Sequence, residues 1–262
     1  MHIESKGLPA SLSFLDLEFS ALTFEEVLAD VAARAGQTRF SYIVTPNVDH
    51  IVKLDSATAV MTERQFATAY EEAALRICDS RILAGLAAVC DIRLPVVPGS
   101  DLTAAIFQRI LGPGHRVAIV GGNNRTVPRL SALYPGVNFV QHIPPMGLLA
   151  NVAAMKAAED FVGNCGASLI LFATGAPQSE ILAHNCFIAG QASGVGLCIG
   201  ASIDFLLGDQ RRAPVWMQKI GLEWAYRLAS NPVRLWRRYL VEGPRIFAIT
   251  AKWWWTRHSQ AA

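Results

Sequence analysis

Apolar positions recur along residues 1–210 in two alternating patterns, and this alternation predicts the architecture. Short apolar runs, typical of strands buried on both faces, alternate with longer stretches in which apolar residues return at helical spacing. The strand-like runs lie within 40–47, 116–124, 138–147, 168–180 and 194–208, and a further short strand ends at Asp79. The pattern predicts an α/β fold with a Rossmann-like, mostly parallel sheet and flanking helices.

The polar residues that follow these strands are candidates for a binding site. In an open parallel sheet, ligands bind in the crevice beyond the carboxyl ends of the strands. The candidates on this argument are Thr45, Asn47, Asp79, Gly121, Gly122, Gly175, Gln178, Glu180, Gly200 and Asp204. Each also has an interpretation as a turn or helix-capping residue, and position alone favours that interpretation for Asp79.

Residues 211–262 contain helix-breaking residues that predict a different organisation from that of residues 1–210. Asn231 followed by Pro232 is typical of a helix start, with Asn as N-cap and Pro at the first helical position. Gly243 and Pro244 form a second break, so three short helices are predicted. We therefore expect an α/β domain over 1–210 and a helical appendage over 211–262.

The net charge of +2 conceals an asymmetry between these two parts. Residues 1–210 contain 13 Lys and Arg against 19 Asp and Glu, a balance of −6, whereas residues 211–262 contain 10 against 2, a balance of +8. All six tryptophans lie in the second part. Basic residues interleaved with Trp, Leu, Ile and Phe fit an anionic membrane surface best, a partner or homo-oligomer interface second, and nucleic acid least.

The sequence contains neither a membrane-spanning run nor a recognisable signal peptide. The hydrophobic fraction is 52%, yet no apolar run reaches the roughly 18 residues needed to cross a bilayer. The N-terminus has an early acidic residue and no basic region before an apolar core, so a cytosolic protein is expected. The five scattered cysteines form no C-x-x-C pair and are expected to be reduced core residues.

Common metal and dinucleotide motifs are missing from the sequence. The histidines have no H-x-x-x-H or H-E-x-x-H spacing, and there is no Asp-x-Asp pair of the kind that holds a divalent ion on a sugar nucleotide. The third glycine of GVGLCIG falls one residue late for an NAD motif. The turn VGGNN can hold a phosphate but is more often a simple turn. We expect no cofactor and no essential metal, so arginines and helix N-termini would neutralise any bound phosphates.

Two motifs resemble the WecG/TagA/CpsF family of bacterial glycosyltransferases, glycosyltransferase family 26. The stretch GASIDFLLGDQRRAPVWMQKIGLEWAYRL, which starts at Gly200, is similar to the family pattern G-x-x-x-D-F-x-x-G-x-x-x-R-A-P-x-W-x-x-x-x-G-L-E-W-x-Y-R-L. TGAPQSE, which starts at Thr174, resembles G-x-P-x-Q-E except that Ser179 separates the Gln from the Glu. VGG, YPG and HIPPMG, which lie earlier in the chain, also occur in family order, and the resemblance runs from about Thr45 to Phe247.

The resemblance implies an inverting, metal-independent enzyme that moves a sugar from a UDP-sugar to a polyprenyl-diphosphate-linked sugar, peripherally at the cytoplasmic face of the bacterial plasma membrane. Asp79 matches the family's proposed catalytic base, and Thr45, Asn47 and Gln178 match residues around the donor sugar. Positions that match the nucleotide site are Gly121, Gly122, Gly175, Glu180, Gly200 and Asp204. The appendage arginines that would close over the site and meet the lipid diphosphate are Arg212, Arg227, Arg234, Arg237 and Arg238.

Two departures from the family pattern bear on the donor sugar. Many members have a glycine after the aspartate, where this chain has Ser80 and Arg81, and Val96 stands where many have an arginine. We therefore expect a hexose such as glucose, as in xanthan-type exopolysaccharide members, with Arg81 replacing part of the lost charge. The alternatives are an N-acetylmannosamine or N-acetylmannosaminuronic acid transferase of teichoic acid or enterobacterial antigen synthesis, and a non-catalytic UDP-binding membrane scaffold.

Overall fold

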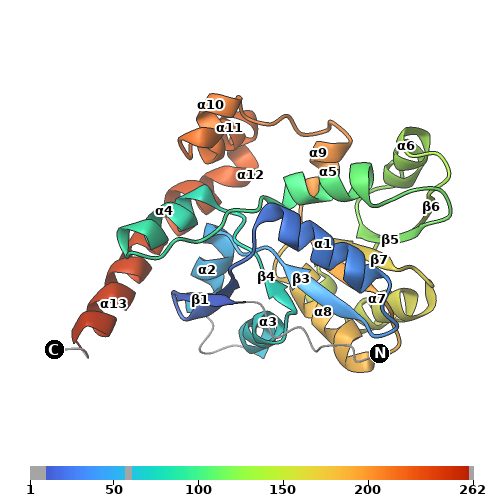
Figure 1. Ribbon diagram of the computed structural model, residues 1–262, viewed down its shortest axis with the longest axis horizontal. Coiled ribbons are helices and arrows are strands. Elements are labelled where there is room, and N and C mark those ends of the chain that lie inside the picture. The colour runs from blue at the N-terminus through green and yellow to red at the C-terminus, as the bar shows by residue number, and fades with distance from the viewer. Residues whose placement is uncertain (1–9, 57–60, 260–262) are drawn as a thin grey trace, which may run out of the picture.

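A six-stranded parallel sheet forms the centre of the computed structural model, which describes residues 10–56 and 61–259 (Figure 1). Residues 1–9, on which the signal-peptide expectation partly rests, lie outside the described residues. The strands, in the order β4-β3-β8-β7-β5-β6, are β3 (Ser41–Val44), β4 (Leu75–Arg76), β5 (Arg116–Gly121), β6 (Asn138–His142), β7 (Leu169–Ala173) and β8 (Val195–Cys198). The predicted α/β, Rossmann-like architecture is confirmed.

Helices cover both faces of the sheet, which explains why its strands are apolar without a break. In β5, Val117 and Ile119 pack into one apolar cluster, whereas Ala118 and Val120 pack into the other. The first face carries α1 (Phe24–Ala35), α5 (Gly99–Arg109), α6 (Thr126–Leu133) and α9 (Ser202–Leu206). The second face carries α2 (Val48–Asp55), α3 (Met61–Glu71), α4 (Arg81–Val89), α7 (Val152–Asn164) and α8 (Gln178–Ala189), with the short turn η1 (Leu148–Ala150) before α7.

An antiparallel hairpin precedes the sheet and was not predicted. Its strands are β1 (Ser11–Phe14) and β2 (Leu17–Ser20). Helix α1 follows, with Thr23 and Glu26 forming a reciprocal capping box at its start. The hairpin buries Phe14 and Phe19 against the second face of the sheet and therefore belongs to the core.

The C-terminal segment is more elaborate than the three short helices predicted. It consists of α10 (Val215–Lys219), α11 (Glu223–Ser230), α12 (Pro232–Trp236), a π-helical turn η2 (Arg237–Glu242) and α13 (Arg245–Ser259). Both predicted breaks occur, but α13 is 15 residues long, because no helix breaker follows Pro244. Asn231 occupies the predicted N-cap position of α12 and Pro232 its first helical position, but the Asn231 side chain makes no capping hydrogen bond.

Helix α13 packs against the α/β core rather than standing apart from it. Ile246 is buried in the same apolar cluster as Phe14 and Ile51. Trp253 packs edge-on against Phe14, with ring centroids 5.3 Å apart, and its Nε1 donates a hydrogen bond to Asp16 Oδ1 at 3.2 Å. The division at residue 210 stays a prediction, and the appendage is anchored to the core at its C-terminal end.

All five cysteines are free thiols, as expected. Cys78, Cys165, Cys186 and Cys198 are buried, and Cys90 is half-buried. Burial raises the pKa of the Cys78 thiol to about 12, so this thiol stays protonated at neutral pH.

Candidate active site

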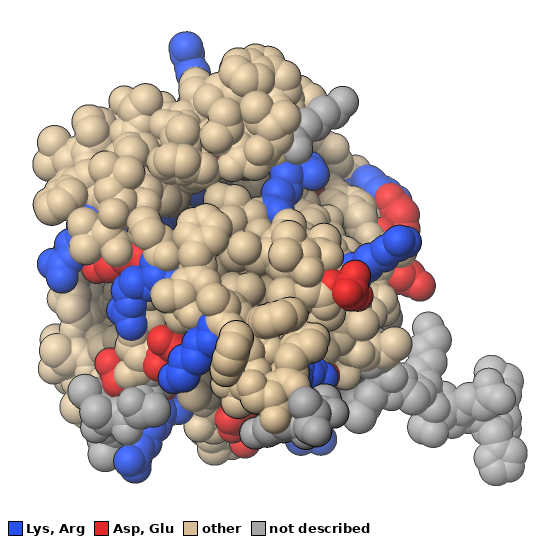
Figure 2. Space-filling model, turned by 90° about the vertical axis from the view of Figure 1, so that its left-hand side faces the viewer, with Lys and Arg blue, Asp and Glu red and all other residues tan. Residues whose placement is uncertain are grey.

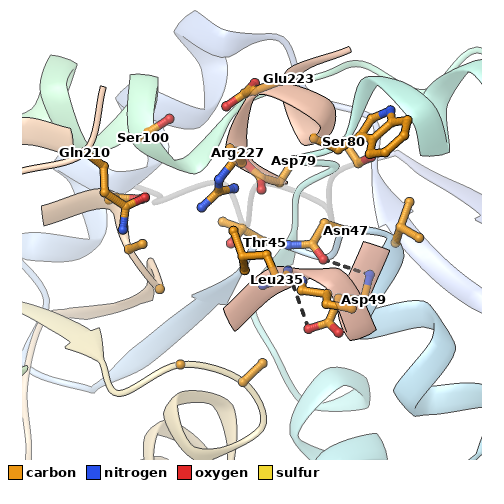
Figure 3. Close-up of a pocket in the computed structure, with 18 of the residues that line it drawn as sticks. Thr45, Asn47, Asp49, Asp79, Ser80, Ser100, Gln210, Glu223, Arg227 and Leu235 are labelled. Atoms are coloured by element: carbon orange, nitrogen blue, oxygen red, sulfur yellow. Dashed lines mark hydrogen bonds and ion pairs between the residues drawn. The ribbon is translucent and has the colours of Figure 1, made fainter. Parts of the chain in front are cut away.

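A cleft of about 1330 Å³ opens between the carboxyl ends of the strands and the first helices of the appendage (Figure 3). One side, which we call the strand-end wall, consists of the residues after β3, β4, β5, β7 and β8. The other side, which we call the appendage wall, consists of residues 210–247. The chain leaves β3 toward one edge of the sheet and reaches its neighbour β8 from the other edge, and such a change of direction leaves a crevice.

Asp79 lies in the strand-end wall beyond β4. Its Oδ1 accepts a hydrogen bond of 2.6 Å from the backbone N–H of Gly99, the first residue of α5. Burial raises the pKa of the Asp79 carboxyl to about 6, and the nearby Glu223 carboxylate raises it too, whereas Gly99, Arg227 and the Asn47 amide act in the opposite direction. A carboxyl group with this pKa is suited to accept a proton at neutral pH.

Glu223 and Arg227 bring the appendage to Asp79. They lie one turn apart on α11, and Figure 3 shows both side chains on the side of Asp79 that faces this helix. Sequence reasoning assigned Arg227 to the site but missed Glu223, although it is the Glu of the GLEW motif. The sequence does not show that Glu223 faces Asp79, because this proximity depends on how α11 packs against the sheet.

Thr45 and Asn47 line the cleft at the end of β3 and also hold its wall together. The Thr45 hydroxyl donates to the Cys198 carbonyl at 3.0 Å and thereby joins the ends of β3 and β8. Asn47 caps α2 through its Oδ1, which accepts a hydrogen bond from Asp49 N at 3.0 Å. The Asn47 side-chain amide also makes a hydrogen bond to the Asp79 carboxyl. Ser80 in the same way caps α4 by accepting from Leu83 N.

The predicted glycines divide into one packing residue and three cleft residues. Gly121 ends β5 at φ +109, and a Cβ there would lie 2.6 Å from the Ala173 carbonyl oxygen, so only glycine lets the ends of β5 and β7 approach. It does not line the cleft. Gly122, Gly175 and Gly200 do line it.

Gln178 and Glu180 start α8 but point to different places. Gln178 lies outside the cleft lining, and its Oε1 accepts from Leu148 N at 3.2 Å, which ties the η1 turn to α8. Glu180 lines the cleft and is only 2% exposed. Burial raises the pKa of its carboxyl to about 7.

Two arginines of the appendage wall share the ring of Phe205. The Arg227 guanidinium lies 5.3 Å and the Arg212 guanidinium 5.9 Å from the ring centroid. Arg212 also pairs with Asp101 in the first turn of α5. Phe205 therefore holds two cations at the cleft before any ligand arrives.

The remaining predicted charges are not all at the cleft. Arg81, Arg234, Arg238 and Asp204 line it. Arg237 does not: its side chain is 75% exposed and pairs with Glu242 on the same turn. Burial raises the pKa of Asp204, whose carboxylate accepts from Gln210 at 3.1 Å.

Sequence reasoning also missed an ionic cluster around Asp49 on α2. Its Oδ2 lies 2.8 Å from Lys53 Nζ and 3.5 Å from an Arg238 nitrogen, so it joins α2 to the η2 turn. The Asp49 side chain is only 10% exposed. The i, i+4 spacing of Asp49 and Lys53 on a predicted helix was the available signal.

A parallel sheet covered by helices, with a polar cleft at the carboxyl ends of its strands, defines a doubly wound α/β protein, a class in which ligands bind at this edge. Within that class, residues 12–260 match the model of the glycosyl transferase WecG/TagA/CpsF family, and the chain belongs to this family. Membership identifies a glycosyltransferase of surface polysaccharide biosynthesis, and the family in general uses a nucleotide-sugar donor and a lipid-linked acceptor.

Proposed function

We propose that the protein transfers a hexose, glucose being favoured, from a UDP-sugar to a polyprenyl-diphosphate-linked sugar with inversion at C1. The observation that carries this proposal is the position of Asp79. Its carboxyl has a pKa of about 6, lies in the cleft and faces the cationic appendage wall.

Asp79 acts as the base in a single displacement. The acceptor hydroxyl oxygen attacks C1 of the donor sugar while its proton passes to the Asp79 carboxylate. The bond between C1 and the diphosphate oxygen breaks, and its electron pair leaves with UDP. One base and one stabilised leaving group suffice for this reaction.

Arginines supply the positive charge that the leaving diphosphate needs. Arg212 and Arg227 are held in place by Phe205, and Arg81, Arg234 and Arg238 line the same cleft. Guanidinium groups bind phosphate oxygens in pairs and stay charged at any physiological pH. In this proposal no metal ion is required.

The choice of a hexose rests on the strand-end wall near Asp79. Ser80 and Arg81 start α4 at the cleft, where many family members have a glycine after the aspartate. Val96 forms a bridge with Cys78 beside Asp79 and contributes no charge where many members have an arginine. In this proposal these departures favour a hexose donor, and Arg81 replaces part of the lost charge.

The appendage also supplies the surface for peripheral binding at an anionic membrane. Leu240, Phe247 and Trp255 are more than half exposed. Figure 2 shows the side on which α13 lies, where Lys and Arg side chains, with Asp and Glu side chains among them, border a broad uncharged area. In the part of the chain that the structure describes, no helix is both long and apolar enough to span a bilayer.

The proposal is tested by UDP release. We expect the full chain to release UDP from a UDP-hexose in the presence of a synthetic lipid-diphosphate sugar, at an unchanged rate in EDTA. Asp79→Asn should lower kcat by about 10² to 10⁴-fold and still bind UDP. Binding of UDP and vesicles without turnover of any donor would instead support the scaffold hypothesis, and full activity of Asp79→Asn would remove Asp79 from the mechanism.

A further inference from the structure

Glu180 is a buried acid, and one of its carboxyl oxygens has no hydrogen-bond partner among the described residues. The residue lies in the first turn of α8 and is 2% exposed, and the oxygen without a partner is its Oε2. Folded proteins leave few such atoms, because a buried polar atom without a partner costs about 1–3 kcal/mol. Since Glu180 also lines the cleft, a ligand in the cleft can supply the missing partner.

The surroundings of Glu180 are unsuitable for a phosphate. The Asp49 carboxylate is among its neighbours, and Lys53 is already engaged with Asp49 Oδ2 at 2.8 Å and the Ala176 carbonyl at 3.3 Å. A phosphate here would meet two acidic groups and a cation that is already neutralised. A neutral ligand with hydroxyl groups fits better.

The protonation state of Glu180 agrees with a hydroxyl ligand. Burial raises the pKa of this carboxyl to about 7, so near neutral pH a large fraction of the molecules carry the proton. A protonated carboxyl group can donate one hydrogen bond and accept others. A sugar hydroxyl can also donate and accept, so the two groups can pair in either direction.

A second unpartnered atom belongs to a residue that pairs with Asp49. The Nε of Arg238 is buried and has no hydrogen-bond partner in the described residues, and the same side chain pairs with Asp49 at 3.5 Å. The strand-end wall and the appendage wall thus each leave one polar atom unsatisfied beside this carboxylate. The two atoms mark one polar corner of the cleft.

We propose that Glu180 binds a hydroxyl group of the transferred sugar and so recognises the sugar, not the nucleotide, of the donor. This inference rests on the proposed function, because it takes the ligand to be a UDP-sugar. It assigns Glu180 to the donor sugar and differs from the nucleotide role that the family resemblance implies for this position.

The experiment compares UDP with UDP-glucose by calorimetric titration of the full chain. In the wild type we expect UDP-glucose to bind more tightly than UDP. In Glu180→Met the affinity for UDP-glucose should fall about tenfold toward that for UDP, while the affinity for UDP stays unchanged. Glu180→Gln keeps a neutral hydrogen-bonding side chain and should retain most of the difference.

Glu159→Met is the matched control, because Glu159 accepts from Asn185 of the same helix α8 at 2.8 Å but does not line the cleft. This variant should leave both affinities unchanged. If Glu180→Met weakens UDP and UDP-glucose equally, or changes neither, the inference is wrong. If the wild type binds no UDP-sugar at all, the proposed function itself fails.

A second measurement uses the wild type alone and covers the case in which Glu180→Met does not fold. UDP-glucose analogues lacking the 2-, 3-, 4- or 6-hydroxyl are titrated in turn. One of them should bind about tenfold more weakly than UDP-glucose, because the hydroxyl that Glu180 binds is missing. Equal affinity of all four analogues for the wild type would overturn the inference.

Discussion

The two walls of the cleft are built in opposite ways. The strand-end wall rests on a parallel sheet buried on both faces and carries carboxyl groups, Asp79 and Glu180, whose pKa values burial raises. The appendage wall consists of short helices, and α11, α12 and η2 contain no buried residue. Its main polar contribution is arginine. Asp79 and Glu180 are thus held by the core, whereas the arginines of the appendage wall lie on helices with little packing of their own.

This difference suggests a division of labour. Proton transfer requires a base fixed within hydrogen-bond distance of one hydroxyl, and a sheet edge provides that precision. Stabilising a diphosphate requires charge more than exact position, and weakly packed helices can deliver it and withdraw when the product leaves. Asp49, Asp101 and Phe205 are points where arginines of the appendage wall are held.

The largest expected effect after Asp79→Asn comes from the cations. Arg227→Met should lower kcat about 100-fold, because a charge near the reacting groups is lost. Arg237→Met should have a much smaller effect, because Arg237 lies outside the cleft. Steady-state kinetics of both variants measures this, and equal losses would mean that the appendage wall rearranges on substrate binding.

The three adjacent tryptophans of α13 are expected to have separate roles. Trp253→Ala should lower the free energy of unfolding by about 2 kcal/mol, because the packing against Phe14 is lost. Trp255→Ala should leave stability unchanged and weaken binding to anionic vesicles several-fold. Chemical denaturation and vesicle flotation distinguish these results, and identical behaviour of the two variants would contradict the division.

Glu223 gives a test of pH dependence. Asp79 must be deprotonated to act as a base, so activity should rise with pH through a pKa of about 6. Glu223→Gln removes a nearby negative charge, lowers the pKa of Asp79 and should shift this rise to lower pH. Arg227→Met should shift it to higher pH. The pH profile of kcat/KM measures both shifts. An unchanged profile in Glu223→Gln would mean that Glu223 does not influence the pKa of the catalytic base.

The last prediction concerns the pH dependence of stability. The pKa of Glu180 is raised in the folded state, so the folded protein binds more protons than the unfolded chain, and stability should fall as pH rises from about 4.5 to about 7. Glu180→Gln should reduce this slope and gain about 1–3 kcal/mol above pH 7. Urea denaturation at pH 5 and pH 8 measures the difference, and equal slopes in both proteins would contradict the shift.

The sequence by itself determined the alternating pattern of the sheet, the breaks before Pro232 and Pro244, and the collection of charge in the appendage. These follow from residue spacing and backbone chemistry, which act over a few positions. The same local rules placed Asp79 and the glycines at strand ends, and the strand ends of a parallel sheet necessarily share one edge.

Only the tertiary structure decided which side chains meet across the cleft. Glu223 lies opposite Asp79 although more than 140 positions separate them, and Trp253 reaches Asp16 in the N-terminal hairpin. Successive residues of a helix point about 100° apart, so three adjacent tryptophans could not all face the same surface. The packing of distant segments decides which tryptophan faces the core and why Gln178 and Arg237 lie outside the cleft. This packing cannot be predicted from the local spacing of residues.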